Sequence, residues 1–156
     1  VDVEETLQAG KEAIKLGDTK EGTFAIRVAV PLAPTKGGAF VNSEGGKNEK
    51  EIWGKRATWV DYYGQVGGET VGIAIFDHPG NPKHPTYWHT RDYGLHSANP
   101  FGERDYYRDK TRDGSLTIQP DGRLSFRYRV FIHSGDAEAA KVADEYKKYA
   151  GARATD

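Results

Sequence analysis

Residues 77–102 hold most of the side chains in this sequence that could carry out chemistry. The segment reads DHPGNPKHPTYWHTRDYGLHSANPFG. Four of the five histidines in the chain fall within 19 of its positions, at His78, His84, His89 and His96. Four prolines restrict its backbone, which lowers the entropy cost of holding side chains in place. Loops anchored on a rigid sheet commonly carry binding and catalytic groups, so we expect the functional site here.

Proton transfer on a sugar is the first chemistry that these residues suggest. Imidazole exchanges a proton near neutral pH, and a neighbouring carboxylate can act as an acid or a base. We therefore expect His78, His89 and Asp77 to be catalytic groups of a hydrolase, lyase or epimerase that acts on a glycan. The residues expected to bind the substrate are Arg91, Trp88, Tyr93, Asn99 and Asp92. An Asp92–Arg91 ion pair and a tryptophan buried in the core remain structural alternatives.

Metal binding is a second chemistry, with His78 and His89 as the candidate ligands. Two or three imidazoles and a carboxylate suit one Cu, Zn or Fe ion. The histidine spacing matches no established zinc motif, because HxH and HExxH are both absent. A His-ligated, metal-dependent oxidoreductase is therefore the alternative function, with His84, His96 or His133 as the candidate further ligand. A third interpretation is a non-catalytic binding or assembly module that forms a homo-oligomer through open sheet edges.

Composition excludes several classes of protein. The chain has 156 residues, which fits a single domain spanning 1–156. With 22 basic and 23 acidic residues the net charge is -1, whereas nucleic-acid-binding domains are usually strongly basic. No apolar run approaches the ~20 residues that span a bilayer. The absence of cysteine excludes disulfides and thiolate ligands.

The elements that position the segment are predicted to be β-strands. Short runs rich in β-branched and aromatic residues, separated by glycine and proline, are typical of an all-β domain. The expected strands are 23–32, 56–63, 71–76, 86–92, 115–119 and 123–133, with a Gly-rich turn at 64–68. The last two are expected to form a hairpin around Pro120–Gly122. Three- and four-residue spacing of apolar residues predicts a helix over 137–150. The sequence thus indicates an antiparallel β-sandwich with one C-terminal α-helix.

Strand alternation also predicts which side chains share a face. On 123–133 the expected core face comprises Leu124, Phe126, Tyr128, Val130 and Ile132. The face left to solvent or a groove comprises Arg127, Arg129, Phe131 and His133. On 86–92, Tyr87, His89 and Arg91 point one way, and Trp88, Thr90 and Asp92 the other.

The sequence resembles an uncharacterised bacterial family labelled "methane oxygenase PmoA". The resemblance rests on GIAIFDHPGNPKHPTYWHTRDYGLHSANPFG (72–102), GDTKEGTFAIRVA (17–29), WGKRATWVDYYG (53–64) and FRYRVFIHSGD (126–136). Members are generally longer, and this chain would correspond to their C-terminal half. The enzyme subunit behind the label spans the membrane, so we do not read the label as an activity.

The resemblance implies a periplasmic or secreted β-sandwich protein of bacteria that degrade plant or algal glycans. The positions that it marks are Asp77, His78, Pro79, Asn81, Trp88, His89, Arg91, Tyr93, Gly94, Asn99, Pro100, Phe101 and Gly102.

Overall fold

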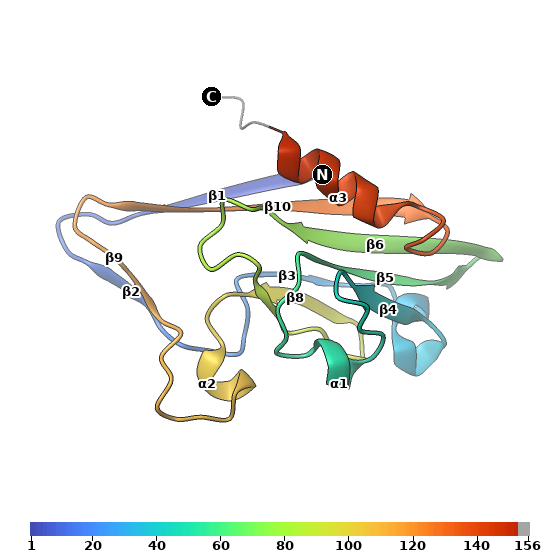
Figure 1. Cartoon of the computed structure of the whole chain (residues 1–156), viewed down its shortest axis with the longest axis horizontal. Coiled ribbons are helices and arrows are strands. Elements are labelled where there is room, and N and C mark those ends of the chain that lie inside the picture. The colour runs from blue at the N-terminus through green and yellow to red at the C-terminus, as the bar shows by residue number, and fades with distance from the viewer. Residues whose placement is uncertain (153–156) are drawn as a thin grey trace.

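Two antiparallel β-sheets form the body of the protein in a computed structural model, which describes residues 1–152 (Figure 1). The large sheet has the order β1 (Asp2–Gln8), β10 (Arg123–Ser134), β6 (Glu69–Asp77), β5 (Trp59–Val66) and β4 (Ala39–Asn42). The small sheet consists of β3 (Phe24–Arg27), β8 (Leu95–Asn99) and β7 (Tyr87–Trp88). A two-stranded ribbon pairs β2 (Ile14–Leu16) with β9 (Leu116–Ile118).

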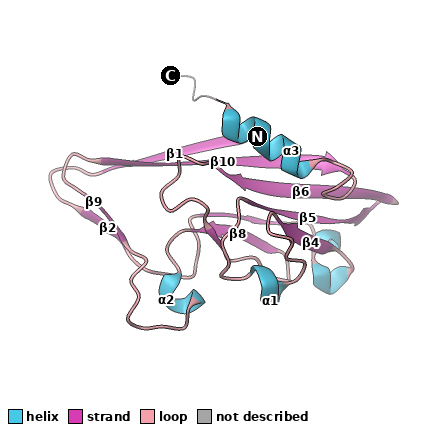
Figure 2. Cartoon of the chain, viewed as in Figure 1, coloured by secondary structure: helices cyan, strands magenta, loops and turns pink. Residues whose placement is uncertain are grey.

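The helices lie outside the two layers. The main one, α3 (Val142–Gly151), covers the large sheet, whereas the single-turn helices α1 (Glu49–Ile52) and α2 (Glu103–Tyr106) lie on the far side of the small sheet (Figure 2). Two 3₁₀ turns, η1 (Val30–Leu32) and η2 (Pro34–Lys36), precede β4. The predicted sandwich with one C-terminal helix is confirmed. Among residues 1–152, no helix is long and apolar enough to cross a membrane.

The main core lies between the facing surfaces of the two sheets. Phe126 and Tyr128 of β10 are buried there, as the alternation of this strand predicts, and Val130 packs against them. Ile132 is the exception, because it lies two residues before the strand ends and is 69% exposed. From the small sheet, Trp88 enters this core with none of its surface exposed.

A second, smaller core lies between the large sheet and α3. It contains Phe76 and Trp59 from the sheet and Val142 and Tyr149 from the helix. Phe131 packs against this cluster, so the helix covers part of the β10 face that was predicted to meet solvent or a groove. The helix also begins at Val142 rather than at 137.

The late start of α3 has a local cause. The Asp136 carboxylate accepts hydrogen bonds from the Glu138 and Ala139 amides, at 3.1 and 2.9 Å, and so holds a turn. Lys141 then adopts a left-handed conformation with φ of 53°, which separates this turn from the helix.

The predicted hairpin of the last two strands is wrong. The turn itself forms, because the Gly122 amide donates to the Gln119 carbonyl at 2.8 Å. However, β9 pairs with β2 and β10 pairs with β1 and β6, so the N-terminal segment occupies the edges that the hairpin would have used. The β1–β10 register covers seven residue pairs, from Asp2↔Arg129 to Gln8↔Arg123.

Three other predicted boundaries also differ. The strand expected over 23–32 ends at Arg27, and a 3₁₀ turn containing Pro31 follows. The strand expected over 86–92 shortens to Tyr87–Trp88, although the His89 amide still bonds to the Ser97 carbonyl at 2.9 Å. Gly67 and Gly68 make the turn after β5, whereas Gly64 belongs to the strand.

Candidate functional site

Asp77 is the centre of the loop that follows β6. Its side chain has no exposed surface. One carboxylate oxygen accepts a hydrogen bond from Asn81 Nδ2 at 2.8 Å, and the other accepts the Thr86 amide at 2.9 Å. The second oxygen also lies 2.7 Å from His84 Nδ1. Asp77, expected to be a catalytic group, therefore orients its own loop and the His84 ring.

Asn81 fixes this loop to the large sheet. Its amide group donates to the Arg127 carbonyl at 2.6 Å and accepts from the Arg127 amide at 2.7 Å. Arg56 braces the other end of the loop, because its guanidinium donates to the carbonyls of Pro85 and Lys83, both at 2.9 Å. The loop is thus held from two directions.

His78 lies on the outer face of the large sheet, beside α3. Its ring contacts Tyr149 edge-on, with centroids 5.2 Å apart, and its Nδ1 accepts the Gly80 amide at 2.9 Å. Burial and the nearby positive charge of Arg127 lower the pKa of His78. A neutral His78 that accepts at Nδ1 carries its proton on Nε2.

The outer face of the small sheet carries polar side chains that are nevertheless buried. The register places His89 beside Ser97, and Ser97 beside Ala25 on the next strand. His89 is 3% exposed and Ser97 2% exposed, whereas Ala25 is exposed. Burial lowers the pKa of His89, so this imidazole is neutral near pH 7.

Two aromatic side chains from the helices flank this row. Trp53, which follows α1, meets the His89 ring edge-on with centroids 6.0 Å apart. The Tyr106 ring of α2 lies 5.1 Å from the Trp53 ring and 5.5 Å from the Tyr87 ring. Trp53, His89, Ser97, Thr23 and Tyr106 are hereafter called the outer-face site.

Four buried polar atoms of this site have no hydrogen-bond partner within residues 1–152. They are His89 Nδ1, Ser97 Oγ, Thr23 Oγ1 and Trp53 Nε1. Buried polar groups in native proteins are nearly always bonded, to protein, water or ligand. The set contains an obligatory donor, the indole N–H, together with hydroxyls that donate or accept. The set therefore contains hydrogen-bonding capacity of both kinds, donor and acceptor, that the described residues leave unused.

The other residues expected to bind substrate have structural contacts. The Trp88 indole is buried in the main core and donates to the Ala57 carbonyl at 2.9 Å. Asn99 is also buried, and its amide group bonds to the Thr19 carbonyl, the Tyr106 hydroxyl and the Phe101 amide. Trp88 thus lies on the core side of the small sheet, whereas Asn99 shares the outer face with Ser97 and bonds to Tyr106 of the outer-face site.

Arg91, Asp92 and Tyr93 lie at its margin. Arg91 forms an ion pair with Glu49 at 3.0 Å rather than with its neighbour Asp92. Tyr93 is 46% exposed and has the guanidinium groups of Arg91 and Arg27 over its ring, at 5.4 and 5.3 Å. The exposed Asp92 helps to line a shallow groove of about 400 Å³ next to α1.

The structure does not bring His78 and His89 together. His78 contacts Tyr149 of α3 above the large sheet, and His89 contacts Trp53 beneath the small sheet, so both layers of the sandwich lie between them (Figure 1). Within residues 1–152, no three His, Asp or Glu side chains group together as ligands for a metal ion.

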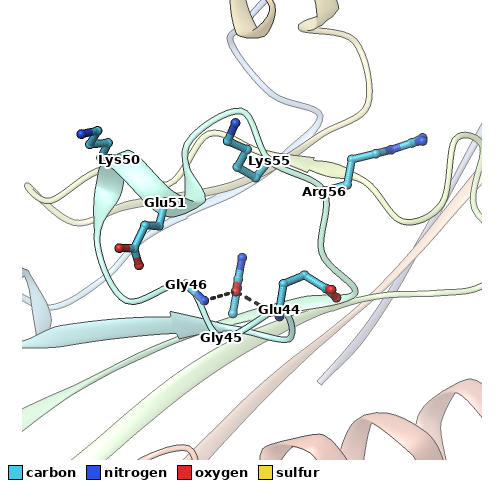
Figure 3. A pocket seen from close by; sticks show the side chains of 8 residues that line it. Glu44, Gly45, Gly46, Lys50, Glu51, Lys55 and Arg56 are labelled. Atoms are coloured by element: carbon cyan, nitrogen blue, oxygen red, sulfur yellow. Dashed lines mark hydrogen bonds between the residues drawn. The ribbon is translucent and has the colours of Figure 1, made fainter.

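A larger hollow of about 610 Å³ lies between α1 and the turn after β4. Asn42 is among its lining residues, and its side-chain oxygen accepts the amides of Glu44 and Gly46 (Figure 3). Its rim carries charges of both signs, and the Arg56 side chain extends away from the hollow. None of the residues predicted to be functional lines it.

Sequence reasoning missed Ser97 and Tyr106, and it named Trp53 only as one of several aromatic residues that could stack on a sugar. The sequence predicts no strand where β8 lies, so it does not place Ser97 beside His89. Trp53 and Tyr106 reach the site from helices of one turn, which leave no periodicity in the sequence.

Gly22 holds the backbone close to Ser97, which leads to a stability prediction. A Cβ atom at Gly22 would lie 1.9 Å from Ser97 Oγ, and its φ of +42° is rare for other residues. We expect Gly22→Ala to lower the free energy of unfolding by about 1–3 kcal/mol. Gly10→Ala is the control, because nothing lies within 4 Å of a Cβ at Gly10. Urea denaturation of both variants checks this, and equal stabilities would contradict the close contact.

Comparison with other proteins identifies a family. None of the curated proteins and none of the solved structures that were compared matches the chain. A family model does match, over residues 1–147, and its description is a family of unknown function. This agrees with the expectation of an uncharacterised family. The chain therefore belongs to the family of unknown function DUF6807.

Proposed function

We propose that this protein binds a carbohydrate, or a similar neutral polyhydroxyl ligand, at the outer-face site. In this proposal His89 and Ser97 bond to ligand hydroxyls, while Trp53 and Tyr106 pack against the apolar face of a sugar ring. A periplasmic or secreted location, where polysaccharides are encountered, belongs to the same proposal.

The observation that carries the proposal is the set of four unpartnered polar atoms beside two aromatic rings. A sugar hydroxyl donates one hydrogen bond and accepts others, so it suits a site that offers an indole N–H, two hydroxyls and a neutral imidazole. Sugar rings also present apolar C–H faces, which pack on aromatic side chains. Ala25, the residue of β3 that pairs with Ser97, is small and exposed, so its side chain leaves this part of the face uncovered.

Affinity electrophoresis in gels containing xylan, galactomannan or β-glucan tests the proposal. We expect the wild type to be retarded by at least one of them. His89→Ala should weaken that binding by about tenfold or more, which corresponds to one or two hydrogen bonds. The matched control is His78→Ala, which removes from the opposite outer face a histidine whose pKa is also lowered by burial.

Two results would contradict this assignment. Equal weakening by His78→Ala and His89→Ala would show that the outer-face site is not the binding surface. A wild type that migrates normally in all three gels would remove carbohydrate binding as the function. Circular dichroism of each variant verifies that the fold is retained.

A further inference from the structure

We propose that His84 is a proton acceptor that Asp77 holds in place, and that it acts on the carbohydrate bound at the outer-face site. This inference rests on the proposed function for its substrate class. The feature that carries it is the Asp77–His84 pair, hereafter the loop dyad, and its one unbonded ring nitrogen.

The tautomer of His84 follows from its partner. An ionised carboxylate only accepts hydrogen bonds, so the 2.7 Å contact from His84 Nδ1 to Asp77 requires a proton on Nδ1. The lone pair of neutral His84 is then on Nε2. This nitrogen has no hydrogen bond within residues 1–152, and 18% of the side-chain surface is exposed. A buried carboxylate that orients an accessible imidazole is the arrangement that activates histidine as a base.

A second Asp–His pair within residues 1–152 serves as a structural comparison. His133 Nε2 contacts Asp61 at 2.9 Å, with 4% and 0% of the two side chains exposed. The His133 ring lies over Gly72, where a Cβ would be 2.2 Å away, and its Nδ1 faces the Ser134 carbonyl. Both nitrogens of His133 are therefore engaged, whereas His84 keeps one free.

A run of side chains joins the loop dyad to the outer-face site. Arg56 bonds to the Pro85 carbonyl, directly after His84, and its guanidinium lies 4.9 Å from the centre of the Tyr87 ring. Tyr87 in turn contacts Tyr106 of the outer-face site, at 5.5 Å between centroids. A glycan that extends from the outer-face site along β7 would therefore lead towards His84.

The step assigned to His84 is a single proton transfer. An O–H bond of a ligand hydroxyl or of a water molecule breaks, and the proton forms a bond with Nε2. The oxygen keeps the electron pair. The imidazolium that forms keeps its Nδ1–H on the Asp77 carboxylate, which stabilises the positive charge.

His78 provides the internal control for a test of the loop dyad. It lies on the same loop but accepts a hydrogen bond at Nδ1, so its neutral form has the opposite tautomer. Long-range ¹H–¹⁵N NMR of the histidine rings should show the proton of neutral His84 on Nδ1 and that of neutral His78 on Nε2. Finding the proton on Nε2 of His84 would overturn the assignment.

Reactivity is measured separately with diethyl pyrocarbonate, which acylates an unprotonated imidazole nitrogen and releases ethanol and carbon dioxide. Peptide mass spectrometry locates the modified residues. We expect His84 to react faster than His78 by about tenfold or more, since its nitrogen lone pair is free. Equal rates, or a faster His78, would mean that the loop dyad only anchors the loop.

The variant His84→Gln tests whether the loop dyad contributes to turnover. It removes the imidazole but leaves the hydrogen bonds from Asn81 and Thr86 to Asp77 in place. On a polysaccharide that the wild type both binds and converts, we expect kcat to fall by about 100-fold or more with KM little changed. Unchanged kcat would overturn the proposal. If no polysaccharide binds, the proposed function fails, while the tautomer and acylation results still decide whether His84 is a base.

Discussion

Lowering the pH from 7 to 3.5 is expected to remove about 4 kcal/mol of stability through His96 alone. This histidine has no exposed surface, and its Nε2 lies 3.1 Å from the Val60 carbonyl between the two sheets. Burial lowers its pKa to about 3, against 6.5 for an unperturbed histidine. Each pKa unit corresponds to about 1.4 kcal/mol.

The sign follows from which state binds the proton. Below pH 6.5 an unfolded chain protonates His96, whereas the folded protein keeps it neutral until the pH approaches 3. The stabilising effect of the neutral ring is therefore complete above the unfolded pKa, and it is lost as the pH falls through this window.

Urea denaturation at half-unit pH intervals measures this effect. His96→Phe keeps a ring of similar size and removes the titrating group. Between pH 6 and 3.5 we therefore expect the free energy of unfolding of the wild type to fall more steeply than that of the variant, by about 1.4 kcal/mol per pH unit. The variant should also be less stable at pH 7, because the bond to Val60 is lost. Parallel pH profiles for the two proteins would refute the assignment to His96.

Trp88→Ala is expected to lower the free energy of unfolding by about 3–5 kcal/mol. The indole is fully buried among residues of the main core, lies 5.5 Å from the His96 ring and donates to the Ala57 carbonyl. Removing it leaves a cavity and an unpaired carbonyl, and rigid cores close such cavities only partly. Thermal and urea denaturation check the size of the loss.

Trp53→Ala is the matched comparison, because Trp53 belongs to the outer-face site and is half-buried. We expect it to cost at most about 2 kcal/mol of stability, but to weaken polysaccharide binding about tenfold. Trp88→Phe, which restores most of the core volume, should bind as the wild type does. If Trp88→Phe weakened binding more than Trp53→Ala, the stacking residue would be Trp88 after all.

Part of the fold follows from local patterns in the sequence. Alternation along β10 predicts that Phe126 and Tyr128 enter the core, and the apolar run before Asp77 predicts a central strand. The placement of Trp88 and His89 on opposite faces also follows from a period of two. Local reasoning did not predict which strands pair. The turn at Gly122 forms, but β9 before it pairs with β2, and β10 after it pairs with β1 and β6.

The sequence by itself therefore determined the sandwich class, the alternation of the strands and the segment in which most functional candidates lie. Only the tertiary structure decided which of these candidates meet. His78 and His89 are close in the chain, but the loop between them passes from one outer face to the other, so they separate. His84 and Asp77 come together because hydrogen bonds to Asn81 and Thr86 fold the same loop back on itself. Such contacts depend on non-local strand pairing and on buried hydrogen bonds, which residue spacing does not encode.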